Sequence, residues 1–298
     1  MSRIISASRR TDIPAFYSEW FLNRLRAGHC SYWHPFGKQW LHVSLLADEV
    51  SGIVFWTKNL GPLLPHLPWV RERYAFYVHF TINDHPRELE PGIIPSEQAI
   101  EQARQVSEAF GVDALVWRFD PIVCTQHTPF ECVIDRFQGL AQRMTGLTNT
   151  CVISFMSPYR RQARAFARAG LELQEPSAQQ RVELSGQIAQ AAQEHGMQLQ
   201  ACCNDDIVQG LVGKAHCIDP SRLVRVGARI DKTVPRAPSR DQCGCYRSVD
   251  IGAYDMCVGG CAYCYANQDH AKAEQNRHRH SPEHDALAQA FIQRDTEV

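Results

Sequence analysis

Three cysteines near the carboxyl end of the chain stand at a spacing that suits a metal centre. Cys257, Cys261 and Cys264 follow the pattern C-x3-C-x2-C. Three thiolates on one short loop can ligate three irons of a cubane and leave the fourth iron without a protein ligand, much as a catalytic zinc keeps one position open. Gly259 and Gly260 suit a loop that folds tightly around an inorganic cube, because glycine reaches backbone conformations that other residues avoid. The spacing therefore predicts a [4Fe–4S] cluster with one open iron.

Two other interpretations of these cysteines remain open. The first is a structural zinc site that takes its fourth thiolate from Cys243 or Cys245. Zinc usually prefers paired C-x2-C elements, and the sequence contains one such pair, Cys261 and Cys264. The second is a redox dithiol formed by that same pair. The spacing favours the iron–sulfur cluster over both.

The remaining cysteines suggest a second metal centre. The chain has 12 cysteines, of which five fall between residues 243 and 264. An auxiliary iron–sulfur cluster could take four thiolates from Cys203, Cys217, Cys243 and Cys245, with Cys202 as an alternative to Cys203. Free thiols packed as small hydrophobic residues would explain Cys202 and Cys217 equally well. In that case we expect Cys243 or Cys245 to be a catalytic or substrate-facing thiol.

Composition limits the class of protein. The chain has 298 residues, a hydrophobic fraction of 44% and a formal net charge of −1, as expected of a folded globular protein. The charge provides no general attraction to nucleic acid or to an anionic membrane. The sequence shows neither a secretion signal nor an apolar run of the roughly 20 residues that cross a bilayer. We therefore expect a cytoplasmic protein whose cysteines bind metal rather than form disulfides.

Short apolar runs alternate with segments of helical spacing, which is typical of βα units around a parallel sheet. The pattern predicts an α/β fold, a full or partial (β/α) TIM-like barrel, as a single domain over residues 1–267 with its cluster-binding loop at 243–267. Residues 268–298 are rich in histidine and charge and are expected to form an exposed C-terminal extension, with metal binding by the histidines as the alternative. The predicted strands are Arg3–Ala7, Gly52–Trp56, Ala75–Ile82, Ala114–Phe119, Cys151–Phe155, Gln198–Cys202 and Val249–Ala253. The predicted helices are Phe16–Ala27, Ser96–Phe110, Phe130–Met144, Tyr159–Ala169 and Ser177–His195.

Polar side chains follow several of these strands. Because the active site of a parallel barrel is built at the carboxyl ends of its strands, we expect these residues to line a pocket. Taken singly, each could instead cap a helix or satisfy a loop backbone. The candidates are Arg9, Arg10, Thr11 and Asp12 after the first strand, Thr57 and Lys58 after the second, Arg118 and Asp120 at the fourth, and Ser154 at the fifth.

The cysteine loop resembles the signature loop of the radical S-adenosylmethionine (SAM) superfamily. The run Met256-Cys-Val-Gly-Gly-Cys-Ala-Tyr-Cys-Tyr-Ala266 is similar to the cluster loop of spore photoproduct lyase-like proteins. Their next strand ends are similar to Arg10-Thr-Asp-Ile-Pro14 and Thr57-Lys-Asn59, and a later loop is similar to Leu89-Glu-Pro91. In the superfamily the loop follows the first strand, so the resemblance implies a permuted barrel whose cluster-binding strand and loop are C-terminal.

The whole chain also resembles a bacterial family of unknown function that is regarded as radical SAM-like. The shared features are Ser6-Ala-Ser-Arg-Arg-Thr-Asp-Ile-Pro14, Gly52-Ile-Val-Phe-Trp-Thr-Lys-Asn59, Trp117-Arg-Phe-Asp-Pro121, Cys243-Gly-Cys245 and the cluster loop. No named reaction comes with that family. This resemblance therefore supports cofactor chemistry more than it indicates a substrate.

The resemblance implies an enzyme that cleaves SAM with a reduced [4Fe–4S] cluster to give a 5′-deoxyadenosyl radical, with an electron donor such as flavodoxin or ferredoxin. We expect Tyr263 to pack near the adenine and Arg9, Arg10, Thr11 and Asp12 to contact SAM or an unknown, small polar substrate. Lys58 and Arg118 would suit a carboxylate, and Asp120 an amine or a hydroxyl.

Two rival functions stay open. One is a non-catalytic iron–sulfur or zinc protein. The other is a nucleic-acid repair lyase, which the near-neutral charge disfavours.

Overall fold

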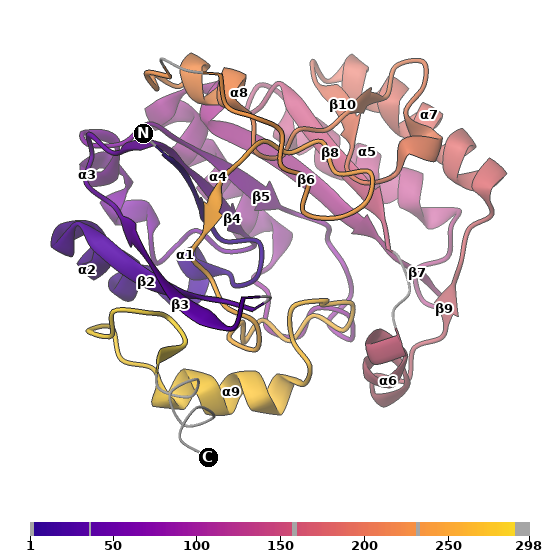
Figure 1. Ribbon diagram of the computed structural model, residues 1–298. Coiled ribbons are helices and arrows are strands. Elements are labelled where there is room, and N and C mark those ends of the chain that lie inside the picture. Colours follow the sequence, from indigo (N-terminus) through magenta and orange to yellow (C-terminus); the bar gives the residue numbers. More distant parts are fainter. Residues whose placement is uncertain (1–2, 36, 157–159, 231–232, 290–298) are drawn as a thin grey trace.

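An eight-stranded parallel sheet forms the centre of the chain (Figure 1). The computed structural model describes residues 3–35, 37–156, 160–230 and 233–289. From one edge of the sheet to the other, the strands are β12 (Val249–Asp250), β1 (Arg3–Ala7), β4 (Val50–Thr57), β5 (Phe76–Thr81), β6 (Leu115–Ile122), β8 (Thr150–Phe155), β10 (Gln198–Ala201) and β11 (Gly213–Lys214). Each pair of neighbouring strands is parallel.

The last strand of the sheet in the chain, β12, lies next to the first, β1. The other seven strands of the sheet follow one another across it in chain order, so β12 lies where a strand preceding β1 would lie. No pairing joins β11 to β12 in the part of the chain that the structure describes. Of the two arrangements predicted, a full or a partial barrel, these residues therefore show an open sheet.

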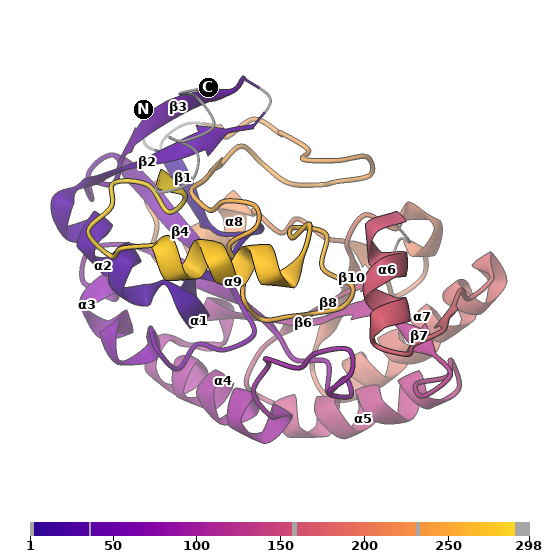
Figure 2. The same cartoon turned by 90° about the horizontal axis from the view of Figure 1, so that it is seen from below.

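Helices cover the outside of the sheet and connect its strands. Figure 2 shows several of them arranged in an arc. They are α2 (Ser18–Ala27), α3 (Leu67–Arg71), α4 (Ser96–Phe110), α5 (Cys132–Met144) and α7 (Ala178–Glu194). The central strands are buried almost throughout, as in β4 and β5, which is why they read as continuous apolar runs. Trp117 and Phe137 stack between β6 and α5 with ring centroids 5.0 Å apart and illustrate the packing of this layer.

Shorter elements complete the fold. The helices are α1 (Ile13–Phe16), α6 (Arg160–Arg168), α8 (Pro220–Arg225) and α9 (His270–Arg279), with single 3-10 turns η1 (Leu64–His66), η2 (Val112–Ala114) and η3 (Asp205–Ile207). Strands β2 (His29–His34) and β3 (Gln39–Ser44) form an antiparallel hairpin, and β7 (Cys124–Thr125) pairs with β9 (Leu173–Gln174). Among the described residues, no helix combines the length and the apolar character that a bilayer crossing requires.

The segment after residue 268 differs from the exposed extension that was predicted. It contains α9, and Ala286, Leu287 and Ala288 are buried. Trp20 in α2 donates from Nε1 to the carbonyl of His284 at 2.8 Å, and the backbone N–H of Ser31 donates to the carbonyl of Asp285 at 2.9 Å. These contacts dock the segment on α2 and β2, because its few apolar residues complete a surface that those elements leave open.

Candidate functional site

The three-cysteine loop is fixed to the residues that follow β1. The hydroxyl of Thr11 donates to the carbonyl of Ala253 at 2.5 Å and accepts from the N–H of Ala253 at 3.2 Å. Tyr17 donates its hydroxyl to the carbonyl of Met256 at 2.6 Å, immediately before Cys257. Thr11 is buried, and its hydroxyl holds the backbone of the loop.

A second segment packs against the same loop from the β5 side. The N–H of Ala262 donates to the carbonyl of Leu89 at 2.9 Å, and the N–H of Gly92 donates to that of Gly259 at 3.2 Å. A Cβ atom at Gly92 would lie 2.9 Å from the Gly259 carbonyl oxygen, so a larger residue there would push the loop away. The loop is therefore clamped between the segment that follows β1 and the segment that follows β5, at the carboxyl ends of these strands.

The three sulfur atoms lie near one another and near backbone donors. The N–H of Ala266 donates to Sγ of Cys264 at 3.4 Å, and the N–H groups of Asp12 and Gly259 hydrogen-bond to Cys257. Burial, followed by the nearby charges of Asp12 and Cys264, raises the pKa of the Cys257 thiol to about 12. Burial also raises the pKa of Cys261 and of Cys264. Thiols in this setting ionise readily only when a cation joins them.

Within the described ranges, no group of three or more His, Cys, Asp and Glu side chains is arranged to hold a metal ion. A mononuclear site such as tetrahedral zinc needs such a group, because all its donors bind one ion.

Asp12 joins β1 to β4 beneath the loop. Its carboxylate accepts from the Thr57 hydroxyl at 2.7 Å, from the N–H of Lys58 at 2.8 Å and from the N–H of Ala15 at 3.0 Å. Burial raises the Asp12 pKa to about 6, although these hydrogen bonds and the Lys58 charge act in the opposite direction. Asp12 and Thr57 are thus engaged with each other and position the strand ends.

A buried ion pair lies beside Cys261. Lys58 Nζ is 2.8 Å from Glu90 Oε1, and the Tyr263 hydroxyl donates to the same oxygen. Burial raises the pKa of Glu90, but the nearby charge of Lys58, and after it that of His85, has the larger opposite effect. The pKa of Glu90 is therefore lowered to about 2. The Tyr263 side chain is 7% exposed, and its hydroxyl is engaged by this contact.

A small cavity of about 190 Å³ adjoins this ion pair. Lys58, Asn83, His85, Arg87 and Glu90 are among the residues that line it. It is smaller than the roughly 300 Å³ at which pockets for whole small molecules begin, so it can hold only part of a ligand.

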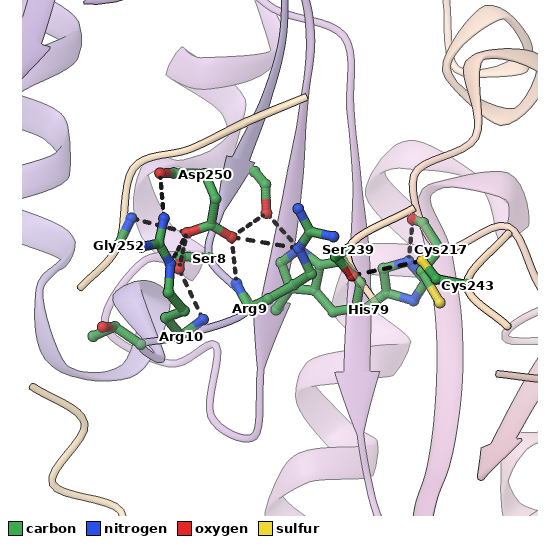
Figure 3. A network of polar contacts seen from close by, with 12 residues as sticks. Ser8, Arg9, Arg10, His79, Cys217, Ser239, Cys243, Asp250 and Gly252 are labelled. Carbon is green, nitrogen blue, oxygen red and sulfur yellow. Dashed lines mark hydrogen bonds and ion pairs between the residues drawn. The ribbon is translucent and has the colours of Figure 1, made fainter. Parts of the chain in front are cut away.

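Asp250 of β12 organises the two arginines after β1 (Figure 3). Its carboxylate accepts from the Ser8 hydroxyl at 2.6 Å, from the N–H of Arg9 at 2.9 Å and from Nε of Arg10 at 3.2 Å. Burial would raise the Asp250 pKa, but Arg10 and Arg9 outweigh it and lower the pKa below its ordinary value. Gly252 must lack a side chain here, because a Cβ atom would lie 2.0 Å from the Ser8 hydroxyl.

Arg118 and Asp120 are paired with each other within β6. Arg118 Nε donates to Asp120 Oδ1 at 2.8 Å, and Ser154 on the neighbouring strand β8 donates to Asp120 Oδ2 at 3.2 Å. Arg118 Nη1 also donates to Sγ of Cys217 at 3.1 Å, and Arg118 is 7% exposed. The three predicted contacts Arg118, Asp120 and Ser154 are therefore brought together, but as a buried network that faces the cysteine at the end of β11.

The structure gathers the predicted residues into two groups at the carboxyl ends of the strands. One surrounds the three-cysteine loop and the other surrounds Cys217. Sequence reasoning missed Asp250 and Tyr265. Tyr265 is 49% exposed and donates its hydroxyl to the carbonyl of Arg9 at 2.6 Å. The signal for Asp250 was its place at the end of the strand before the loop, and for Tyr265 it was an aromatic residue next to a predicted ligand.

A family model described as a domain of unknown function, DUF1848, matches residues 4–266. The chain belongs to the DUF1848 family. The match spans the sheet and the three-cysteine loop, and it ends before α9. No curated protein and no solved structure matches the chain. The DUF1848 assignment thus confirms the resemblance to a family of unknown function, and the site itself must indicate the chemistry.

Proposed function

We propose that the chain is a radical SAM enzyme in which Cys257, Cys261 and Cys264 ligate a [4Fe–4S] cluster whose open iron binds SAM. The observation that carries the proposal is the position of the three-cysteine loop. It follows β12 at the edge of a parallel sheet and is clamped to residues after β1 and β5. Ligands of parallel α/β folds bind at that end of the strands.

The surroundings of the sulfur atoms favour a cluster over zinc. Each thiolate of a cubane binds its own iron, so three thiolates on one short loop suffice to hold it. Backbone N–H groups directed at Cys257 and Cys264 are the kind of hydrogen bond that tunes an iron–sulfur cluster. The donor set therefore fits the proposed cofactor.

The cofactor would supply the bond cleavage, and the protein residues would supply placement. A cluster held by Cys257, Cys261 and Cys264 would supply one electron for cleavage of a sulfur–carbon bond of SAM, which yields methionine and a 5′-deoxyadenosyl radical. Thr11 and Asp12 hold the loop and the end of β4, and the ion pair of Lys58 with Glu90 lies beside Cys261. Arg9 and Arg10, whose side chains are 22% and 14% exposed, retain access to the surface and would contact a carboxylate of SAM or of a small polar substrate.

The decisive test is cleavage of SAM by the full-length chain. The protein is purified without oxygen, reconstituted with iron and sulfide, reduced with dithionite and incubated with SAM. We expect 5′-deoxyadenosine and methionine in equal amounts. In a cell the electron would come from a flavodoxin or ferredoxin of the cytoplasm.

The controls separate a catalytic cluster from other metals. The variant Cys261→Ser should abolish the product, whereas Cys132→Ser, at an exposed cysteine in α5, should leave it unchanged. A brown protein that yields no 5′-deoxyadenosine would contradict the catalytic proposal. A colourless protein with one zinc per chain would contradict the cluster as well.

A further inference from the structure

Five cysteines outside the three-cysteine loop form a closed ring of sulfur contacts. Sγ of Cys202 lies 3.8 Å from that of Cys203 and 3.5 Å from that of Cys217. Cys203 in turn hydrogen-bonds to Cys243, Cys243 to Cys245, and Cys217 to Cys245. Five thiols from three separate loops thus meet at one place, which we call the five-cysteine ring.

The backbone is shaped to bring these sulfurs together. Gly244 separates Cys243 from Cys245, and a Cβ atom there would lie 2.6 Å from the carbonyl oxygen of Ala215. Cys203 has a φ of +56°, a left-handed conformation that is unfavourable for any residue with a side chain. Such strain persists where the position of a side chain matters to function. The geometry therefore points to Cys203 as a ligand and not as a packing residue.

Cationic and hydroxyl donors surround the ring. Arg118 donates to Sγ of Cys217 at 3.1 Å, Arg240 hydrogen-bonds to Cys203, and the hydroxyl of Ser239 donates to Sγ of Cys243 at 3.6 Å. Cysteines that serve only as small hydrophobic residues need no guanidinium partner. Two guanidinium groups directed at the sulfurs instead suit a group of thiolates that carries negative charge.

The ring brings together five thiols, one more than a single tetrahedral metal ion binds. In the part of the chain that the structure describes, no three of these side chains are arranged to hold one ion. A polynuclear cluster distributes its thiolates over several irons, and four thiolates suffice for it. We propose that Cys203, Cys217, Cys243 and Cys245 ligate a second iron–sulfur cluster, and that Cys202 lies beside it as a hydrogen-bonding neighbour.

The second cluster would border the same site as the three-cysteine loop. Arg9 lies between the two groups, because its side chain is an ion-pair partner of Asp250 at 3.5 Å and also senses the charges of Cys245 and Cys217 (Figure 3). Tyr265, next to Cys264, bonds to the carbonyl of Arg9. The inference stands on the five-cysteine ring alone and does not rest on the proposed function.

Metal and sulfide content of matched variants tests the proposal. The full-length protein is reconstituted without oxygen, and iron and acid-labile sulfide are measured per chain. The quadruple variant Cys203→Ser, Cys217→Ser, Cys243→Ser, Cys245→Ser should lose about two to four iron atoms relative to the wild type, the content of a four-thiolate cluster. The triple variant Cys257→Ser, Cys261→Ser, Cys264→Ser should retain that same amount, and Cys202→Ser and Cys132→Ser should match the wild type.

The triple variant keeps the test valid even if the quadruple variant does not fold, because it asks whether iron and sulfide remain when the first loop has no thiols. Iron with sulfide in that variant supports the second cluster. Its absence, or zinc without sulfide in the same protein, would overturn the proposal. Iron that is retained in full by the triple variant, with the ring intact, would instead count against the proposed function and leave this inference standing.

Discussion

Removing one partner of the ion pair between Lys58 and Glu90 should destabilise the protein strongly, because the other charge is then left buried. Glu90 is 5% exposed and accepts hydrogen bonds from Lys58 and Tyr263. Replacing Glu90 with glutamine leaves the Lys58 ammonium, whose side chain is 15% exposed, without its directly bonded counter-charge. Removing one partner of a buried ion pair typically costs about 3–5 kcal/mol of unfolding free energy.

The pKa of Glu90 gives an independent estimate of the same quantity. The difference between about 2 in the folded protein and the ordinary 4.5 corresponds to about 3 kcal/mol, since one pKa unit is worth about 1.4 kcal/mol. Because the folded pKa is the lower one, this contribution is fully present above about pH 5. It is lost as the pH falls from about 4.5 to 2.

The assay is thermal unfolding of the metal-free, reduced protein, followed by circular dichroism. For a chain of this length, 3 kcal/mol should lower the Tm of Glu90→Gln by roughly 6 °C at pH 7. The deficit should shrink below about pH 4.5. The matched control is Glu97→Gln, which removes an exposed ion pair of Glu97 with Arg143 and should change the Tm by about 1 °C or less.

A double variant separates the pairing from the loss of either side chain. Lys58→Met alone leaves the Glu90 carboxylate buried and should be as harmful as Glu90→Gln. Lys58→Met combined with Glu90→Leu removes both charges and should cost only about 1 kcal/mol, the hydrogen bond that Tyr263 loses. A Tm for Glu90→Gln that equals that of Glu97→Gln, or additive losses in the double variant, would refute the reasoning.

Three further predictions concern other parts of the site. Gly252→Ala should displace Ser8 and reduce the iron content and the Tm of the reconstituted protein, whereas Gly186→Ala in α7, where a Cβ atom meets nothing within 4 Å, should leave the Tm equal or slightly higher. Burial first, and then nearby cations, lower the pKa of His85 to about 4. The contribution of neutral His85 to the stability is therefore fully present above about pH 6.5 and is lost as the pH falls toward 4. The Tm of His85→Gln should depend less on pH between 6.5 and 4 than the Tm of the wild type. Trp20→Phe removes the bond to the carbonyl of His284 and should make trypsin cleavage after Arg277 or Arg279 several-fold faster, and an unchanged digestion rate would show that this bond does not hold the segment.

The central strands could be predicted from the sequence because parallel strands covered on both faces form continuous apolar runs. The predicted Arg3–Ala7 is the observed β1, and the predicted Ser96–Phe110 is the observed α4. The helix start at Ser177 was also found, with a capping box to Gln180. Helix α4 begins at Ser96, as predicted, and the residue that caps it is Pro95.

The hairpin of β2 and β3 and the short strand β11 escaped prediction for physical reasons. The hairpin carries His, Trp and Gln on a surface that is only partly buried, so it shows no clear alternation. Strand β11 has two residues, too few for any period. The predicted helix Tyr159–Ala169 corresponds to α6, and its first residue lies outside the described ranges.

The sequence predicted which residues lie at the candidate site but not which of their side chains pair with one another. The side chains after β1, β4 and β6 do gather at the carboxyl ends, as the fold class requires. The sequence could not reveal that Arg118 and Asp120 bind each other. Nor could it reveal that Thr57 and Lys58, at the end of β4, donate hydrogen bonds to the Asp12 carboxylate. Such pairings depend on side-chain geometry between neighbouring strands, which has no sequence signal of its own.

One short segment of the chain contains cysteines of both groups and the edge strand of the sheet. Residues 243–264 contain Cys243 and Cys245, then β12, then the three-cysteine loop. Strand β12 has two residues and pairs with β1 alone, so the backbone ladder holds it weakly. Asp250 holds the strand more firmly, because its carboxylate accepts hydrogen bonds from Ser8, Arg9 and Arg10.

Metal binding at either end of that segment would therefore tighten the same edge strand, because ligation free energy is also folding free energy for residues that the metal orders. Arg9 and Arg10, whose side chains keep some access to the surface, are oriented by that strand. Loss of metal should then loosen the arginines that would contact SAM or the substrate, even though neither arginine is a ligand. The position of Asp250 between the two cysteine groups thus explains how cluster assembly and substrate placement can depend on one another.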